Sequence, residues 1–164
     1  MRPLAAFAAL GLAFAALQPA SAQNLAQIDH ARAGADCPHC NLFQADFGGT
    51  RLKGRNFAGA RLRQADFSAS VMNRTSFAGA DLRDVNAYGA VFTGTNFAGA
   101  NLTNASFVGA YLEGANFRGA RLAGVNFSGA EMGRAVGLTQ GQLSEACGDE
   151  ATELPQGLRI RRCD

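Results

Sequence analysis

Hydrophobic and polar positions of this chain repeat every five residues over more than half of its length. From Cys40 to Arg134 the sequence divides into nineteen consecutive five-residue blocks without an insertion. The third residue of a block is Leu, Phe or Met in eighteen blocks, with Ala87 as the exception, and the first residue is Ala in eleven. A period of five fits neither the 3.6-residue period of an α-helix nor the two-residue period of a β-strand. A repeat of this kind predicts the stacked units of a solenoid.

The arrangement of small and large residues predicts how each block folds. We expect the first and third positions to face inwards, so that a block is a short extended piece followed by a turn. Gly is the fifth residue in twelve blocks, and glycine permits the positive φ that a tight turn needs. Four blocks would close a coil of about twenty residues, and main-chain hydrogen bonds would stack the coils ~4.8 Å apart.

The third positions predict two ladders of side chains inside such a coil. At a spacing of twenty residues, leucines stack on one side of the coil and phenylalanines on another, which fills a narrow interior without voids. The predicted core ladders are Leu42, Leu62, Leu82, Leu102 and Leu122, and Phe57, Phe77, Phe97 and Phe117.

Blocks such as Ala-Asp-Leu-Arg-Asp at 80–84 and Ala-Asn-Leu-Thr-Asn at 100–104 follow the pattern A-(D/N)-L-x-x. In this pattern the chain resembles the pentapeptide-repeat family over residues 40 to 134. The resemblance implies an all-β fold, a right-handed quadrilateral β-helix in which the first and third positions point inwards. Arg55 departs from the pattern, because it places a charge at an inward first position. Either that corner is distorted or the guanidinium reaches solvent between coils.

The first residues have the features of a secretory signal peptide. Arg2 precedes fourteen apolar residues, from Leu4 to Leu17, and Ala20-Ser21-Ala22 follows them. We therefore expect cleavage before Gln23 and export. The apolar run is shorter than the roughly 20 residues that span a bilayer, so we expect no transmembrane segment in the mature chain. The periplasm is the predicted compartment, with release to the exterior as the alternative.

Helical caps are expected at both ends of the repeats, since a solenoid otherwise leaves unpaired edges. Leu25 and Ile28 suggest a short amphipathic helix before the first coil. Thr139 and Gln142 have the spacing of a capping box, and Gly148 is expected to end the helix that they begin. The predicted organisation is a signal peptide at 1–22, an N-terminal cap at 23–39, the β-solenoid at 40–134 and a C-terminal helical cap with a disulfide-pinned tail at 135–164.

The four cysteines predict disulfides, because their number is even and export is expected. The two ends of the rod lie far beyond the roughly 7 Å that separates bridged Cα atoms. Cys147 and Cys163 are therefore the pair compatible with the fold, and Cys37 and Cys40 are left to pair with each other or to stay reduced.

The motif Cys37-Pro38-His39-Cys40 also suggests redox chemistry, since the same four residues occur in periplasmic thiol oxidases. In those enzymes the motif opens a helix after a strand of a thioredoxin fold, which lowers the pKa of the first thiol. Here a β-solenoid follows at once. We predict a structural role for the pair and keep a thiol–disulfide function as one alternative. A zinc site at Cys37, His39 and Cys40 would lack a fourth ligand.

Residues for other chemistry are sparse in the sequence. The chain has two histidines, His30 and His39, and no G-x-S-x-G or phosphate-binding motif. Asp46, Asp66 and Asp81 recur at the outward second position of their blocks, where turns can use them. We predict a protein that is not an enzyme and holds no cofactor and no metal.

Charge gives the last prediction from sequence. The net charge of +2 is too small to indicate a nucleic-acid partner. Residues 51–74 nevertheless hold six bases and one acid. They predict a docking patch for an anionic partner, either an acidic protein face or a lipid headgroup surface; the alternative is a solvated collar that keeps the rod soluble. The patch residues are Arg51, Lys53, Arg55, Arg61, Arg63 and Arg74.

These observations predict a non-enzymatic exported scaffold or interaction module, whose partner is an unidentified protein or envelope component. The resemblance also raises a second alternative, since some pentapeptide-repeat proteins shield DNA gyrase, a topoisomerase, by imitating DNA. Such mimicry requires an acidic surface, whereas residues 40–134 hold ten bases and six acids.

Overall fold

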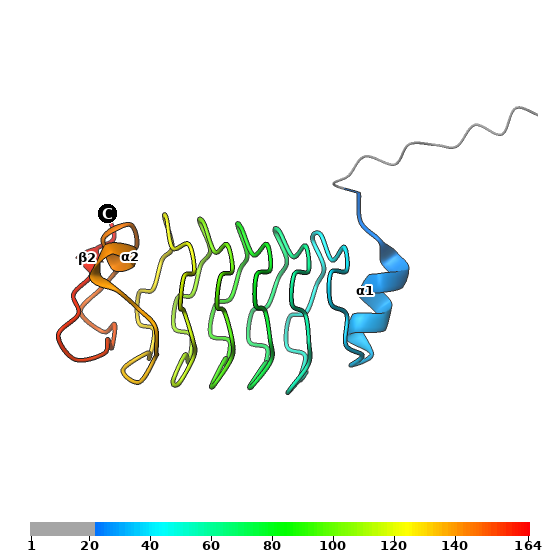
Figure 1. Ribbon diagram of the computed structural model, residues 1–164, viewed down its shortest axis with the longest axis horizontal. Helices are drawn as coiled ribbons and strands as arrows, with labels where there is room; N and C mark the ends of the chain where they lie inside the picture. The colour runs from blue at the N-terminus through cyan, green and yellow to red at the C-terminus, as the bar shows by residue number, and fades with distance from the viewer. Residues whose placement is uncertain (1–21) are drawn as a thin grey trace, which may run out of the picture.

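The computed structural model describes residues 22–164, so the predicted signal peptide lies outside the described residues except for Ala22. The described chain forms an elongated stack of coils with helix α1 (Leu25–Arg32) at one end and helix α2 (Gln140–Ser144) at the other (Figure 1). Strands β1 (Cys147–Gly148) and β2 (Arg161–Arg162) pair in parallel at the C-terminal end. Neither helix is long and apolar enough to cross a membrane.

The coils are held together by parallel β-bridges between residues twenty positions apart. Asn41 pairs with Arg61, Arg61 with Asp81, and the series continues through the stack. Each block between 40 and 134 consists of one bridged residue followed by a two-residue turn. Four such blocks make one twenty-residue coil, and the stacked coils form a β-helix solenoid (Figure 1). The right-handed sense of the coil stays a prediction.

The turns explain why glycine is frequent at the fifth position. Glycines there have φ near +65°, and the other residues in the same position, except Arg134, have φ between 53° and 60°. Such left-handed backbone favours glycine. At Gly59 space adds a second constraint, because a Cβ atom there would collide with the imidazole ring of His39.

The predicted core ladders are buried. The four rings of Phe57, Phe77, Phe97 and Phe117 stack on successive coils with centroids 5.3–5.6 Å apart. All five leucines of the other ladder are at most 2% exposed. Stacked rings at this separation have the offset geometry that aromatic pairs favour.

Ala87 interrupts a second phenylalanine ladder, and a ring from a neighbouring side of the coil compensates. Phe92 packs its edge against Phe67 and Phe107 on the coils before and after Ala87, with centroids 6.1 and 5.7 Å apart. The residues one coil away from Phe92 in its own ladder are Met and Leu. The ring of Phe92 thus takes the place of the phenylalanine that is missing at position 87.

The solenoid begins before the predicted boundary at Cys40. The backbone N–H groups of Cys37 and His39 donate to the carbonyls of Asn56 and Ala58, in the same register as later coils. Residues 35–39, Ala-Asp-Cys-Pro-His, therefore form one further block, with Cys37 in the place of the apolar third residue. The stretch predicted as N-terminal cap thus supplies part of the first coil.

Helix α1 covers the first coil with a different face from the one predicted. Ile28 and Ala31 are buried, whereas Leu25 is 66% exposed. The expectation that Leu25 packs on the coil was wrong, because the buried face runs through Ile28 and Ala31, and Leu25, six positions before Ala31, is turned ~120° away from it around the helix.

At the C-terminal end, the capping box of Thr139 and Gln142 is confirmed. The helix that it begins ends at Ser144, however, and not at Gly148, which belongs to β1. Asn126 pairs with Cys147 and Glu131 with Glu153. The residues after α2 therefore return to the ladder, and the tail closes a last, irregular coil.

Candidate functional site

We number the four sides of the solenoid as faces 1 to 4 in chain order, and define each by its row of outward second-position residues. Face 1 carries Asn41, Arg61, Asp81, Asn101 and Arg121; face 2 carries Asp46, Asp66, Asn86, Ser106 and Asn126; face 3 carries Arg51, Val71, Val91, Tyr111, Glu131 and Glu153; face 4 carries Asn56, Ser76, Asn96, Asn116 and Val136. Each row is in register across the coils. Since a coil has four blocks, faces 1 and 3 lie on opposite sides.

The structure divides the predicted basic patch between two faces. Arg61 and Arg63 lie on face 1, and Arg63 pairs with Asp84 at 3.3 Å. The other four bases belong to the blocks of face 3 and the corner that follows it. The prediction of one continuous patch of six residues was therefore wrong, because residues ten positions apart lie half a coil from each other.

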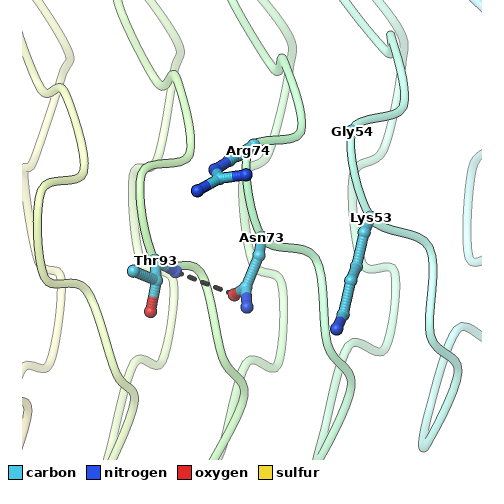
Figure 2. Close-up of a pocket in the computed structure, with 5 residues that line it drawn as sticks. All are labelled: Lys53, Gly54, Asn73, Arg74 and Thr93. Atoms are coloured by element: carbon cyan, nitrogen blue, oxygen red, sulfur yellow. Dashed lines mark hydrogen bonds between the residues drawn. The ribbon is translucent and has the colours of Figure 1, made fainter.

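The four bases on the side of face 3 gather with a fifth from α1. We call this group the basic cluster; it consists of Arg32, Arg51, Lys53, Arg55 and Arg74. Arg32, Arg51, Lys53 and Arg55 line a shallow hollow of about 500 Å³ between α1 and the first coil. Lys53 and Arg74 line a neighbouring hollow of about 390 Å³ on the next coils (Figure 2).

Arg55 joins the cap to the first coil. Its Nη1 donates to the Gly34 carbonyl at 2.8 Å, and its Nε donates to the Lys53 carbonyl at 3.1 Å. The guanidinium thus leaves the inward position and lies half-buried between the end of α1 and the coil. Of the two expectations for Arg55, the structure supports the one in which the charge reaches out of the interior.

The second hollow is shaped by the turns of three successive coils. The Asn73 Oδ1 accepts a hydrogen bond from the Thr93 N–H at 3.1 Å, which fixes this side chain across two coils. Figure 2 shows Lys53 on one side of Asn73 and the Arg74 guanidinium above it, turned towards the coil of Thr93. Gly54 leaves room beside them. The two cations are exposed and face solvent over this hollow.

The charge of the basic cluster is largely unneutralised. Within residues 22–164, Arg51, Lys53, Arg55 and Arg74 have no carboxylate within 4.0 Å, and Arg32 reaches Asp46 only at 4.0 Å. Other bases on the solenoid do have close partners. Arg83, for example, binds Asp81 at 2.6 Å, and its hydrogen bond holds the pKa of Asp81 below the usual range.

Along the row of face 3, the basic cluster is followed by apolar residues and then by acidic residues. Val71 and Val91 are half-buried, and Tyr111 is 45% exposed. Glu131 and Glu153 follow in the same row. This change from basic to apolar to acidic residues along face 3 was not predicted from the sequence, although the twenty-residue spacing from Arg51 to Glu131 is sufficient to reveal it.

Both cysteine pairs form disulfides. Cys37 bonds to Cys40 and Cys147 to Cys163, with Cα–Cα distances of 5.4 and 4.9 Å. Cys37 is only 2% exposed and fills a core position of the first coil. A nucleophilic thiol needs to be accessible, so this placement fits a structural bridge. In residues 22–164 no three His, Cys, Asp or Glu side chains gather where they could hold a metal ion.

Comparison with known proteins agrees with the repeat and the fold. Eight copies of the family described as pentapeptide repeats match residues 56–86 and 95–134. Together with the uninterrupted blocks between 40 and 134, this match identifies the repeats of this chain as pentapeptide repeats. No curated protein matches the chain.

Several solved structures are similar. A pentapeptide repeat protein from Nostoc is 23% identical over 87% of this chain and 93% of its own, with a TM-score of 0.51, which supports the fold. A pentapeptide repeat protein from the Arabidopsis thaliana thylakoid lumen is 33% identical with a TM-score of 0.32, and the match covers 53% of either chain. This chain therefore spans about half the length of the Arabidopsis protein. QnrB1, a plasmid-mediated fluoroquinolone resistance protein, is 22% identical over 75% of this chain and 76% of its own, with a TM-score of 0.34.

Proposed function

We propose that this protein is an exported, non-enzymatic interaction module that binds a protein or envelope partner through face 3. One observation carries the proposal: the unneutralised basic cluster adjoins the row of Val71, Val91 and Tyr111 on one side of the coil. Unpaired cations attract an anionic partner, and the partly exposed apolar side chains beside them supply area that binding can bury.

The solenoid suits this role because its faces are ordered before binding. Each coil is tied to the next by main-chain hydrogen bonds of 2.7–3.1 Å, such as those of Val71 to Thr50 and of Phe92 to Tyr111. A partner that docks on a preformed surface loses little of its affinity to the ordering of loops. In the middle of the row on face 3, Val71 and Val91 are short and lose little rotamer freedom when a partner binds.

Export is supported by the signal-like first segment and by the two disulfides, which persist in oxidising compartments. The test is N-terminal analysis of the protein isolated from its own cells. We expect a chain that begins at Gln23. A chain that keeps residues 1–22 would contradict export by cleavage.

Two alternatives receive less support. The surplus of bases over acids in the repeats does not resemble the phosphate charge of DNA, which argues against topoisomerase protection. A supercoiling assay with excess protein tests this alternative, and an unaffected gyrase would exclude it. The covered Cys37 does not favour thiol exchange, which an assay with a model dithiol would detect. A catalytic role is not favoured either, since Asp46 and Asp66 accept hydrogen bonds from the turns that follow them.

Affinity capture with matched variants tests the role of face 3. Lys53→Ala with Arg74→Ala removes two exposed cations of the basic cluster, and Arg61→Ala with Arg121→Ala removes two exposed cations of face 1. We expect the first pair to reduce the partner that co-purifies at least tenfold and the second pair to leave it unchanged. Equal capture by both pairs would contradict the proposal. Circular dichroism confirms that both variants are folded.

A further inference from the structure

We infer that the partner of face 3 is a second copy of this chain, bound face to face with the two rods antiparallel. The inference rests on the proposed role of face 3 and specifies its partner. The observation behind it is the order of charges along face 3, which is complementary to that of a second, antiparallel copy of the same face.

The outward row of face 3 changes character from one end to the other. It runs Arg51, Val71, Val91, Tyr111, Glu131, and each residue bridges to the next in parallel register. The N-terminal end is basic and is extended by Arg32 and Lys53 around the same hollow. The C-terminal end is acidic and is extended by Glu153, which bridges to Glu131. Neutral side chains occupy the middle.

A two-fold axis that lies in the plane between the two faces, perpendicular to the rods and between the two copies of Val91, brings opposite charges together. Arg51 of one copy then faces Glu131 of the other, and Val71 faces Tyr111. One coil further out, the acidic Glu153 faces the cap that carries Arg32. Since a two-fold axis repeats every contact, each pair occurs twice in the dimer.

The turns beside this row fit the same arrangement. At the fourth position of the blocks, Lys53 of one copy faces Gly133 of the other. At the fifth position, Arg134 faces Gly54. The long side chains therefore meet glycines, and shallow hollows flank Thr93, which lies in the same central block as Val91, on both sides. Arg134 is also neutralised by Glu113 at 2.7 Å within its own chain, which weakens repulsion between Arg134 and Lys53.

The size of the face predicts a weak, reversible dimer. Five coils at ~4.8 Å spacing give a contact only about 20–25 Å long. Such a contact buries less than the roughly 800 Å² per partner of a standard interface. We therefore expect a dissociation constant in the micromolar range or weaker, with dimerisation that decreases as salt rises because exposed ion pairs are screened.

Sedimentation velocity of the purified mature chain, over a concentration series at low salt, tests the inference. We expect a dimer that grows with concentration. Arg51→Glu and Glu131→Arg should each weaken dimerisation at least tenfold, because each brings like charges together. In the double variant the two charges are exchanged, so that each introduced carboxylate faces an introduced guanidinium of the other copy. The double variant should therefore dimerise like the unaltered chain.

Arg61→Glu is the matched control, since it makes the same charge change at the same block position on face 1. We expect it to leave dimerisation unchanged. Should Glu131→Arg not fold, Glu153→Arg reverses the acidic end at an exposed residue. The inference is overturned if the unaltered chain stays monomeric at about 0.5 mM, or if the double variant does not recover dimerisation. A monomer that still captures another protein through face 3 would refute the dimer and leave the proposed function standing.

Discussion

Three buried hydroxyl groups at first positions of blocks differ in how they are satisfied. The Oγ1 atoms of Thr75 and Thr95 donate to the carbonyls of Leu52 and Met72, both at 2.9 Å. The Ser70 Oγ is fully buried and has no hydrogen-bond partner within the described part of the chain. A buried hydroxyl without a partner costs free energy that an apolar side chain of similar size does not. The threonines therefore stabilise the coil, and Ser70 does not.

We expect Ser70→Ala to leave the free energy of unfolding unchanged or to raise it by up to ~1 kcal/mol. Thr95→Val keeps the shape of the side chain and removes its hydrogen bond, so it should lower that free energy by about 0.5–1.5 kcal/mol. Urea unfolding of both variants measures the difference. A loss on Ser70→Ala as large as that on Thr95→Val would contradict this account of the interior.

The pairing of Ala87 with Phe92 predicts a compensating double substitution. Ala87→Phe alone should destabilise by about 1–3 kcal/mol, because Phe92 already occupies the space. Combined with Phe92→Leu, the same change restores the phenylalanine ladder and should cost less than the sum of the two single changes by at least ~0.5 kcal/mol. Additive losses in the unfolding free energies would show that the two sites do not share one space.

At this scale the sequence predicted well which residues are inside. A period of five maps first and third residues to the interior, and this mapping holds even at Ala87, with Arg55 as the exception. The surface was predicted less well. Arg51 and Arg61 are close in sequence but lie on opposite faces, which the twenty-residue coil already implied. Arg32 could not be assigned to the cluster, because its position depends on how Ile28 seats the helix.

Side chains of the two caps complete the hydrogen bonds of the end coils. At the N-terminal end, the Gln27 Oε1 accepts from the Asn41 N–H at 2.6 Å. At the C-terminal end, the Gln142 Nε2 donates to the carbonyls of Phe117 and Ala120, both at 2.9 Å. The Asn41 N–H and the Ala120 carbonyl would otherwise have no neighbouring coil to bond with, and unpaired buried backbone groups are costly. The Phe117 carbonyl also accepts from the Ala120 N–H at 3.0 Å. The caps therefore stabilise the solenoid by hydrogen bonding as well as by covering its apolar ends.

Gln142→Ala should lower the free energy of unfolding by about 1–3 kcal/mol, because it removes two carbonyl partners together with half of the capping box. Gln156→Ala is the control, since Gln156 is exposed and its side chain makes no hydrogen bond within residues 22–164. Thermal unfolding monitored by circular dichroism compares the two variants. Equal midpoints would contradict a capping role for Gln142.

Asp149 predicts a pH-dependent contribution of the C-terminal cap. Its pKa is lowered from the usual 3.8, chiefly by the hydrogen bond that its carboxylate accepts from the Gly129 N–H at 2.8 Å. A lowered pKa means that the carboxylate stabilises the fold above its usual pKa, and that this contribution is lost as the pH falls below it. Asp149→Asn should therefore be less stable than the unaltered chain at pH ~7, with the gap closing below pH ~4. A gap that does not change with pH would refute this.

Among the elements, the start of α2 was predictable because a capping box is a local pattern. Its end was not, because Glu145 and Cys147 return to the ladder of the last coil and so stop the helix before Gly148. Pairing with the preceding coil decides where the helix ends, and the local sequence does not show this pairing. The same holds for residues 35–39, whose block becomes recognisable only when Cys37 is accepted as an apolar residue.

On the scale of the whole molecule, the solenoid turns a linear sequence into four surfaces of different chemistry. Face 3 combines unneutralised bases, an apolar middle and an acidic end, whereas the row of face 4 is uncharged throughout. The rod itself needs only the inward positions, so the outward rows are free to carry recognition. Its function is expected in the difference between faces.

Photo-crosslinking in intact cells compares the four faces in one experiment. A photoreactive amino acid is placed at Val91 on face 3, and at Asn101, Asn86 and Asn96 as equivalent positions on faces 1, 2 and 4. We predict a discrete crosslinked species from Val91, whether with a second copy or with another protein, and none of comparable yield from the other three. Equal crosslinking from all four positions, or a discrete product from another face alone, would contradict binding through face 3.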